Sequence, residues 1–304
     1  MANAYKKRKI HVSIADGAVS VFTYAVVVSL CLLILLPCLN VLALSFNNGK
    51  DAARGGVYFW PREFTLQNYV EVFRNGSILS AYKITLARTF VGTLLSLVVT
   101  TLAAFALNQA ELPGRKTITF LITFTMLFGG GTIPTYIQYN NLHLVDTFWV
   151  YVIPSLVSVT YLIMTRSFFD GIPYALQEAA RLDGCGYFQT YFRIMLPLSK
   201  PVIAVVGLYT AVNHWNDWFS GAFYMTSSKM WPVQTVLQQM LERAMSSSRQ
   251  INDVAEAIAV GQSNVTTDSL KMAAVVITTV PILCVYPFVQ KYFAKGVMFG
   301  AVKG

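Results

Sequence analysis

The sequence predicts an all-α integral membrane protein with six transmembrane helices. Of its 304 residues, 55% are hydrophobic and only 12% are charged, whereas typical soluble domains carry about 25% charged residues. A helix needs about 20 residues to cross the hydrocarbon core of a bilayer. Uncharged runs near that length recur along the chain, and their continuously apolar character favours helices over β-strands. These runs are Gly17–Gly49, Thr89–Ala110, Thr117–Val145, Thr147–Thr165, Pro201–Asn216 (resuming after Asp217 to Ser228) and Met272–Gln290.

The positions of the basic residues predict the orientation in the membrane. The net charge is +9, which taken alone would suit nucleic acid, but Lys6, Lys7, Arg8 and Lys9 lie shortly before the first apolar run. Basic residues next to a span mark its cytoplasmic side. Six spans then place both the N-terminal segment (1–18) and the C-terminal tail (294–304) in the cytoplasm. We therefore expect the bilayer, and no nucleic acid, as the partner of the basic residues.

The first two helices are expected at Val19–Phe46 and Leu79–Asn108. The first apolar run is far longer than the 7–15 residues of a signal-peptide core, which predicts a retained helix. Pro37 marks a kink in it. Near the outer end of the second helix, Arg88 is expected either to reach water or to face a cavity. The outer segment between them, residues 47–77, is expected to form an ordered cap.

The remaining helices follow from the other apolar runs within one membrane domain, residues 19–293. The third is expected to end near Phe128, because three glycines and Pro134 follow it. The fourth, fifth and sixth are expected at about Thr147–Phe168, Pro201–Tyr224 and Leu270–Tyr292. An outer segment, residues 225–269, separates the last two and contains helix-like stretches at 233–245 and 253–260.

A polar segment, residues 170–200, interrupts the apolar runs. Residues 174–183 are good helix formers, and Gly184 is suited to the left-handed conformation that ends a helix. A second short helix is expected at 187–195, ended by Leu196–Pro197. The segment should therefore form a helix–glycine–helix structure, which we call the Gly184 hairpin (residues 170–200).

One face of the first hairpin helix is apolar, since Ile172, Leu176, Ala179 and Leu182 recur at helical spacing. Small residues at Ala179, Ala180 and Gly184 would permit close approach of a partner, and Leu176 and Leu182 are suited to filling a groove. Amphipathicity alone fits equally well with a helix that lies on the lipid surface.

The hairpin carries a specific pattern. Glu178-Ala179-Ala180 is followed by three residues, Gly184, nine residues and Ile194-x-Leu196-Pro197. This pattern resembles the coupling loop of permease subunits of ATP-binding-cassette (ABC) importers, and the whole chain resembles the maltose-type carbohydrate permeases among them. Further matching features are Phe59-Trp60-Pro61 with Phe64-Thr65-Leu66-Gln67-Asn68-Tyr69, Ile133-Pro134 with Asp146-Thr147, Trp215-Asn216-Asp217 and the tail 296–304. The run from Phe128 to Pro134 looks most like the branch for complex oligosaccharides.

The resemblance implies a type I importer permease in the bacterial cell membrane. A second homologous permease, two ATPase subunits and an extracytoplasmic sugar-binding protein are the implied partners. ATP and magnesium would bind to the ATPase, because no G-x-x-x-x-G-K-[ST] phosphate loop occurs in this sequence. This chain would thus be a transport subunit without an enzymatic activity or a cofactor of its own. The implied coupling residues are Leu176, Glu178, Ala179, Ala180, Arg181, Asp183, Gly184, Ile194, Leu196 and Pro197.

The most polar cluster inside an apolar run is His214-Trp215-Asn216-Asp217. Polar and aromatic groups at membrane depth suit a sugar path, but they equally suit packing between helices. His214 and Asp217 could also be read as the acid and base of an intramembrane enzyme, since residues three apart share a helix face. That reading leaves the hairpin pattern unexplained.

Two further alternatives stay open. The importer could carry a peptide, phosphate or another solute in place of a sugar. The outer segment 225–269 could contact the binding protein or be a disordered connector. No metal site and no disulfide framework are expected, because the four cysteines form no CxxC pair and no cluster of zinc spacing with histidine.

Overall fold

The computed structural model describes residues 14–74, 76–250 and 265–301, and within these ranges every regular element is helical. The predicted all-α class is therefore confirmed for the described residues. An isolated bridge between Asn47 and Phe64 is the one strand-like pairing recorded there. The basic run Lys6–Lys9 and the helix-like stretch 253–260 lie outside the described residues.

The chain divides into two units. The first comprises residues 1–69 and 253–276, and the second comprises 70–252 and 277–304. The α-helices are α1 (Ile14–Ser45), α2 (Gly49–Ala53), α3 (Gln67–Arg74), α4 (Ser77–Asn108), α5 (Arg115–Thr125), α6 (Thr132–Asn141), α7 (Val159–Asp170), α8 (Ala175–Leu182), α9 (Tyr187–Thr190), α10 (Leu196–Leu198), α11 (Lys200–Asn216), α12 (Phe219–Tyr224), α13 (Val233–Gln250) and α15 (Thr267–Ala301). Short tighter or wider turns are η1 (Phe148–Tyr151), η2 (Ile153–Ser155), η3 (Tyr191–Met195) and η4 (Ser228–Met230).

In the first unit, Asn68 holds the outer segment together. Its amide nitrogen donates to the carbonyl oxygens of Ser45 and Asn47, each at 2.9 Å, and its amide oxygen accepts from the Ser269 hydroxyl at 2.9 Å. All of these polar side chains are buried. Since buried polar groups are stable only when hydrogen-bonded, Asn68 fixes the end of α1 and the start of α15. The expected ordered cap is thus present.

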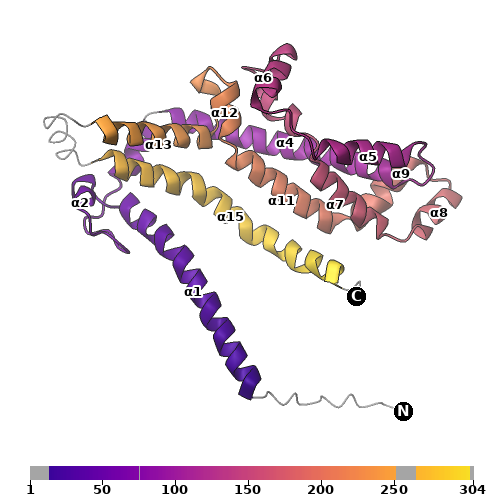
Figure 1. The fold of residues 1–304 in the computed structure, drawn as a ribbon, viewed down its shortest axis with the longest axis horizontal. Helices are drawn as coiled ribbons and strands as arrows, with labels where there is room; N and C mark the ends of the chain where they lie inside the picture. The colour runs from indigo at the N-terminus through magenta and orange to yellow at the C-terminus, as the bar shows by residue number, and fades with distance from the viewer. Residues whose placement is uncertain (1–13, 75, 251–264, 302–304) are drawn as a thin grey trace. The chain divides into compact units, whose positions relative to one another are not determined.

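In the second unit, α4 packs along α11 and α7. A Cβ atom on Gly92 of α4 would lie 2.3 Å from Nε2 of His214 on α11, so only glycine permits this close approach. A buried apolar cluster then joins the last turns of α4 to α7 and η3; its members are Ala104, Phe105, Leu107, Leu162, Phe169, Tyr191 and Met195. The same unit carries α8 and α9 at the end where α4 finishes (Figure 1).

Three described helices are long and apolar enough to cross a membrane: Val19–Ser45, Ser77–Asn108 and Thr267–Cys284. The number reaches five only if each of two bent pairs is one span: Phe148–Ser155 with Val159–Asp170, bent by 45°, and Tyr187–Leu198 with Lys200–Asn216, bent by 81°. The expected third span corresponds to α5, which has only 11 residues and ends at Thr125. The structure therefore supports several spans but does not confirm a count of six.

The expected continuous fourth and fifth helices are wrong. The fourth is broken between η2 and α7, next to Pro154 in η2. The fifth ends at Asn216, and α12 begins at Phe219, because Asp217 leaves the helical conformation (ψ 102°) and its Oδ1 accepts the backbone N–H of Ser220 at 3.0 Å. An aspartate that bonds the first turn of a new helix is an N-terminal cap. The sixth helix continues past the expected end at Tyr292, to Ala301.

Candidate functional site

The Gly184 hairpin folds as two short helical segments around one glycine. Helix α8 ends at Leu182, and Gly184 follows with φ +80°, the left-handed conformation expected there. Helix α9, the π-turn η3 and α10 form the second arm, which continues to Leu198, past the expected end at Leu196–Pro197. Tyr191 and Met195 of this arm insert into the buried apolar cluster. The hairpin is thus anchored by its second arm.

The first arm leaves an apolar surface uncovered. The side chain of Leu176 is 43% exposed and that of Leu182 is 89% exposed. Glu178, Ala179, Asp183, Gly184 and Pro197 are exposed as well. Ile194 and Leu196 are half-buried. Leu196 and Ile172 both pack against the apolar cluster, so Ile172 does not belong to the exposed apolar face on which it was expected. Ala180 is only 5% exposed and packs within the chain, and its expected role in the approach of a partner stays a prediction.

The buried side of α8 is polar, and it connects the hairpin to the end of α4. Gln177 is 1% exposed and pairs with Gln109, whose Nε2 donates to Gln177 Oε1 at 3.1 Å. Gln177 Nε2 in turn donates to Asn108 Oδ1 at 3.0 Å, and Asn108 Nδ2 donates to Asp170 Oδ1 at 2.7 Å. This amide chain links α8, α4 and α7. Sequence reasoning missed it; the signal was a Gln on the face of α8 opposite Leu176 and Leu182.

Arg181 adds a charged contact to the same connection. Its guanidinium binds Glu111, in the turn after α4, and donates to Gln109 Oε1 at 2.9 Å. Tyr187 of α9 donates its hydroxyl to Glu111 Oε2 at 2.7 Å. The hydrogen bonds from Tyr187 and from Arg181 lower the pKa of Glu111, and the one from Tyr187 has the larger effect. Both arms of the hairpin therefore hold one carboxylate of the α4–α5 turn.

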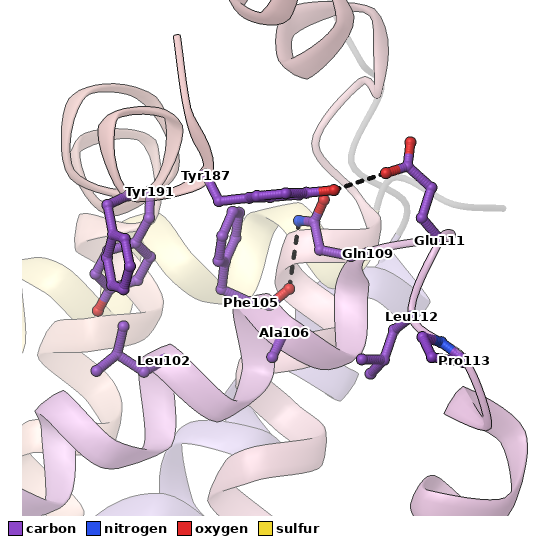
Figure 2. A pocket seen from close by; sticks show the side chains of 10 residues that line it. Leu102, Phe105, Ala106, Gln109, Glu111, Leu112, Pro113, Tyr187 and Tyr191 are labelled. Carbon is purple, nitrogen blue, oxygen red and sulfur yellow. Dashed lines mark hydrogen bonds between the residues drawn. The ribbon is translucent and has the colours of Figure 1, made fainter.

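A pocket of about 380 Å³ lies between the second arm and the end of α4 (Figure 2). Figure 2 shows Phe105 and Ala106 of α4 on one side, with Tyr187 and Tyr191 facing them. The dashed Tyr187–Glu111 bond closes one edge, and Gln109 donates to the Phe105 carbonyl oxygen at 3.4 Å. The lining is mostly apolar, with Gln109 and Glu111 among its polar members.

The four residues of the polar cluster in the fifth apolar run separate in the structure. His214 is 3% exposed and packs against Gly92, and Trp215 is 7% exposed and donates to the Thr278 carbonyl oxygen at 3.1 Å. Asn216 is exposed. Asp217 binds Arg88 of α4, with Nη2 at 2.5 Å from Oδ2. The sequence analysis singled out both residues but not their pairing. The Arg88 side chain is 1% exposed and lines a cavity, so of the two expected positions the cavity is the one observed.

His214 and Asp217 line one cavity of about 370 Å³ within the second unit. Most of its other wall residues are aromatic or carry a hydroxyl group, among them Tyr139, Tyr151 and Tyr161. The Arg88 guanidinium lies 4.4 Å from the Tyr151 ring centroid, a cation–π contact. Trp215 and Asn216 do not line this cavity. For acid–base chemistry Asp217 would have to reach a substrate proton, but its Oδ2 is held by Arg88 and its Oδ1 by Ser220.

The chain is similar to a family of membrane proteins over most of its length. Residues 76–299 match the family model described as "Binding-protein-dependent transport system inner membrane component". This segment covers α4 through most of α15 and includes the entire Gly184 hairpin.

Named relatives match over nearly the whole chain. One is the polygalacturonan/rhamnogalacturonan transport system permease protein YtcP of Bacillus subtilis (strain 168), 36% identical over 92% of this chain and 96% of that protein. Another is protein LplC of the same strain, 38% identical over 89% of this chain and 90% of LplC. Among solved structures, a chain of a bacterial ABC transporter involved in the import of the acidic polysaccharide alginate aligns with a TM-score of 0.83. Its sequence is 25% identical, and the alignment covers 96% of this chain and 100% of that one.

Proposed function

Because the chain belongs to the family of binding-protein-dependent transport system inner membrane components, we propose that it is the membrane-spanning permease subunit of an ABC importer for oligosaccharides or polysaccharide fragments. The observation that carries the proposal is its 36% identity over nearly its full length to a permease named for polygalacturonan and rhamnogalacturonan transport. The likeness to the alginate importer points to the same class. Acidic polysaccharide fragments are the first substrates to test.

We propose that the Gly184 hairpin is the contact through which ATPase subunits drive the permease. Leu176 and Leu182 present an apolar surface on an otherwise polar arm, which fits insertion into a groove of a partner. The second arm is anchored in the apolar cluster, and the first is tied to α4 by the amide chain. A displacement of the exposed surface by a partner would therefore be transmitted to α4 and α7 through buried contacts, and would not be lost in the movement of a loop.

The finer architecture follows from the same proposal. Six spans would place both termini in the cytoplasm, on the side of the hairpin. A second permease subunit would complete the channel, and two ATPase subunits would hydrolyse ATP on their own magnesium-dependent sites. The switch between outward and inward access would be a two-state change biased by ATP and by the loaded binding protein.

The cavity lined by His214 and Asp217 is proposed as part of the sugar path. Tyrosine rings and hydroxyl groups in one cavity suit a pyranose, whose faces stack on aromatic rings and whose hydroxyls form hydrogen bonds. Trp215 is proposed to pack helices instead, since it is buried and bonded to the α15 backbone. Asn216, which is exposed and does not line this cavity, would serve the path only in the assembled channel.

The outer contact with the binding protein is proposed to involve α13 and the loop before it. Val233, at the start of α13, donates its backbone N–H to the Thr85 hydroxyl of α4 at 2.8 Å. Asp146 accepts from the Thr226 hydroxyl at 2.8 Å and also from its backbone N–H. These bonds give the described part of residues 225–269 a fixed attachment, which favours a docking surface over a loose connector.

The proposal is tested in proteoliposomes that contain this chain, its second permease and its ATPase. Purified binding proteins encoded beside it are loaded with galacturonan, alginate or malto-oligosaccharide fragments, or with a dipeptide as the non-sugar control. ATP hydrolysis and uptake of labelled solute are measured together. Stimulation by one of the loaded carbohydrates, with uptake, is the expected result. Stimulation by the dipeptide alone would overturn the carbohydrate assignment and leave only the transport assignment.

A further inference from the structure

A third cavity of the second unit, of about 810 Å³, is lined by three basic side chains. It lies at the start of α5 and beside α7, and its cations are Arg115, Lys116 and Arg166. The Asp170 carboxylate lies 3.9 Å from Arg115 Nη2 and 3.8 Å from Arg166 Nε, and both distances are longer than a hydrogen bond. One carboxylate thus faces two of the three cations.

Asp170 is already engaged elsewhere. Its Oδ1 accepts a hydrogen bond from Asn108 Nδ2 at 2.7 Å, within the amide chain of the hairpin. The Nε of Arg166 is buried and has no hydrogen-bond partner in the described structure, while its Nη1 donates to Thr119 Oγ1 at 2.8 Å. The Arg166 side chain as a whole is 19% exposed and lines the cavity, and Thr119 fixes its orientation, so its terminal N–H groups can donate to a phosphate oxygen. The site also includes the first turn of α5, whose backbone N–H groups favour an anion.

The surface beyond the cations is apolar. Phe120 lines the cavity and is 65% exposed, and Ile118, Leu121 and Phe124 of the same helix are 39%, 55% and 45% exposed in this chain. This arrangement is complementary to an anionic lipid. The headgroup would meet the cations at the start of the helix, and the acyl chains would lie along its apolar side chains. A free phosphate compound would use the cations but not this apolar face.

We propose that this cavity binds the phosphate group of an anionic phospholipid in the membrane leaflet next to the Gly184 hairpin. Arg115, Lys116 and Arg166 hold the phosphate oxygens, and Phe120 packs against the start of the acyl chains. Arg115 and Arg166 also face Asp170, the last residue of the amide chain. The bound lipid would therefore contact that chain through these two arginines. This site is separate from the proposed sugar path and from the exposed surface of the hairpin.

The test uses the purified importer complex, stripped of lipid in detergent and titrated with phosphatidylglycerol, with phosphatidylcholine or with sn-glycerol 1-phosphate. Native mass spectrometry counts bound lipid. We expect phosphatidylglycerol to be retained in preference to phosphatidylcholine. The Arg115→Gln/Lys116→Gln variant should bind phosphatidylglycerol more weakly, by roughly fivefold for each charge removed. Arg193→Gln/Lys200→Gln, which removes two cations outside the cavity, is the matched control and should retain wild-type lipid binding.

Three results would overturn the proposal. One is wild-type retention by the Arg115→Gln/Lys116→Gln variant. Another is an equal loss in the control variant, which would mean that net charge alone attracts the lipid. A third is displacement of phosphatidylglycerol by equimolar glycerol phosphate, which would indicate a soluble anion as the occupant. If the double variant fails to assemble, Lys116→Gln alone decides the question, because the Lys116 side chain is exposed and its loss disturbs no packing.

Discussion

Arg88 and Asp217 form an ion pair between α4 and the break that follows α11. Arg88 Nη2 lies 2.5 Å from Asp217 Oδ2, and Nη1 donates to the Asp217 carbonyl oxygen at 3.1 Å. The same aspartate caps α12 through its other carboxylate oxygen. One side chain of α4 therefore fixes both the place where the fifth apolar run bends and the wall of the proposed sugar path.

Replacing Asp217 by Asn should destabilise the permease more than any exposed substitution does. The change leaves Arg88, which is 1% exposed, charged and unpaired, and removing one partner of a buried pair costs about 3–5 kcal/mol. Thermal unfolding of the purified complex measures the loss. The double variant Arg88→Gln/Asp217→Asn is the control, and it should be more stable than Asp217→Asn alone. Equal stability of Asp217→Asn and the wild type would show that the pair is not buried as described.

Gly92→Ala should force α4 and α11 apart. The added Cβ atom would lie 2.3 Å from His214 Nε2 and 2.5 Å from Cε1, and the ring is buried, so the helices must shift. Overpacking of this kind costs about 1–3 kcal/mol. Gly17→Ala, whose Cβ atom would meet nothing within 4 Å, is the matched control and should be neutral or stabilising. Melting temperatures of the two variants provide the comparison, and a loss confined to Gly17→Ala would contradict the packing described.

Gln177→Leu should loosen the Gly184 hairpin. It removes the acceptor for Gln109 and the donor for Asn108, and a buried polar group left without its partner costs about 1–3 kcal/mol. Limited proteolysis at residues 181–193 should accelerate relative to the wild type. Glu178→Leu, at the adjacent exposed position, should leave the cleavage rate unchanged. Identical rates for Gln177→Leu and the wild type would mean that the amide chain does not hold the hairpin.

The contacts of Glu111 should be lost only in acid. Its pKa is lowered, first by the Tyr187 hydrogen bond and then by Arg181, so the carboxylate contributes stability above its ordinary pKa of 4.5. That contribution disappears as the pH falls through the lowered pKa. Hydrogen exchange of the hairpin, corrected for intrinsic rates, should therefore be constant from pH 6 to 8 and increase only below the ordinary pKa of 4.5. Glu111→Gln should exchange faster across the neutral range; a wild-type rate in this variant would contradict the argument.

Local features were predictable from the sequence, and contacts between distant residues were not. The end of α8 follows from Gly184, because the left-handed conformation is a property of one residue and its neighbours. The Arg88–Asp217 pair joins residues 129 positions apart, and no spacing pattern reveals it. The break at Asp217 did leave a local signal, an aspartate three residues before Ser220 that can cap a new helix. The apolar run concealed that signal.

The buried side of the hairpin illustrates the same limit. Helical spacing correctly placed Leu176 and Leu182 on one face, which is exposed. Ala180 was assigned to a partner because it is small. The hairpin sequence could not show that its side meets α4, because that contact depends on Gln109 and Glu111, which lie outside the hairpin. The roles of the coupling and path residues remain predictions, since placement does not establish what a side chain does during transport.

The role of the Gly184 hairpin in coupling is tested most directly in the Leu182→Asp variant, by measuring how strongly the loaded binding protein stimulates ATP hydrolysis. Leu182 suits the test better than Gly184 does, because Gly184 has φ +80° and any side chain there strains the hairpin itself. Leu182 is 89% exposed, so a charge there disturbs a partner rather than the fold. Leu182→Met keeps an apolar side chain and is the matched control.

We expect Leu182→Asp to insert into the membrane and to assemble with the second permease. Its ATPase stimulation and its sugar uptake should each fall at least tenfold, an effect of about 1.4 kcal/mol. Leu182→Met should keep both. Wild-type stimulation and uptake in Leu182→Asp proteoliposomes would contradict the claim that this exposed surface carries the force of the ATPase into the membrane.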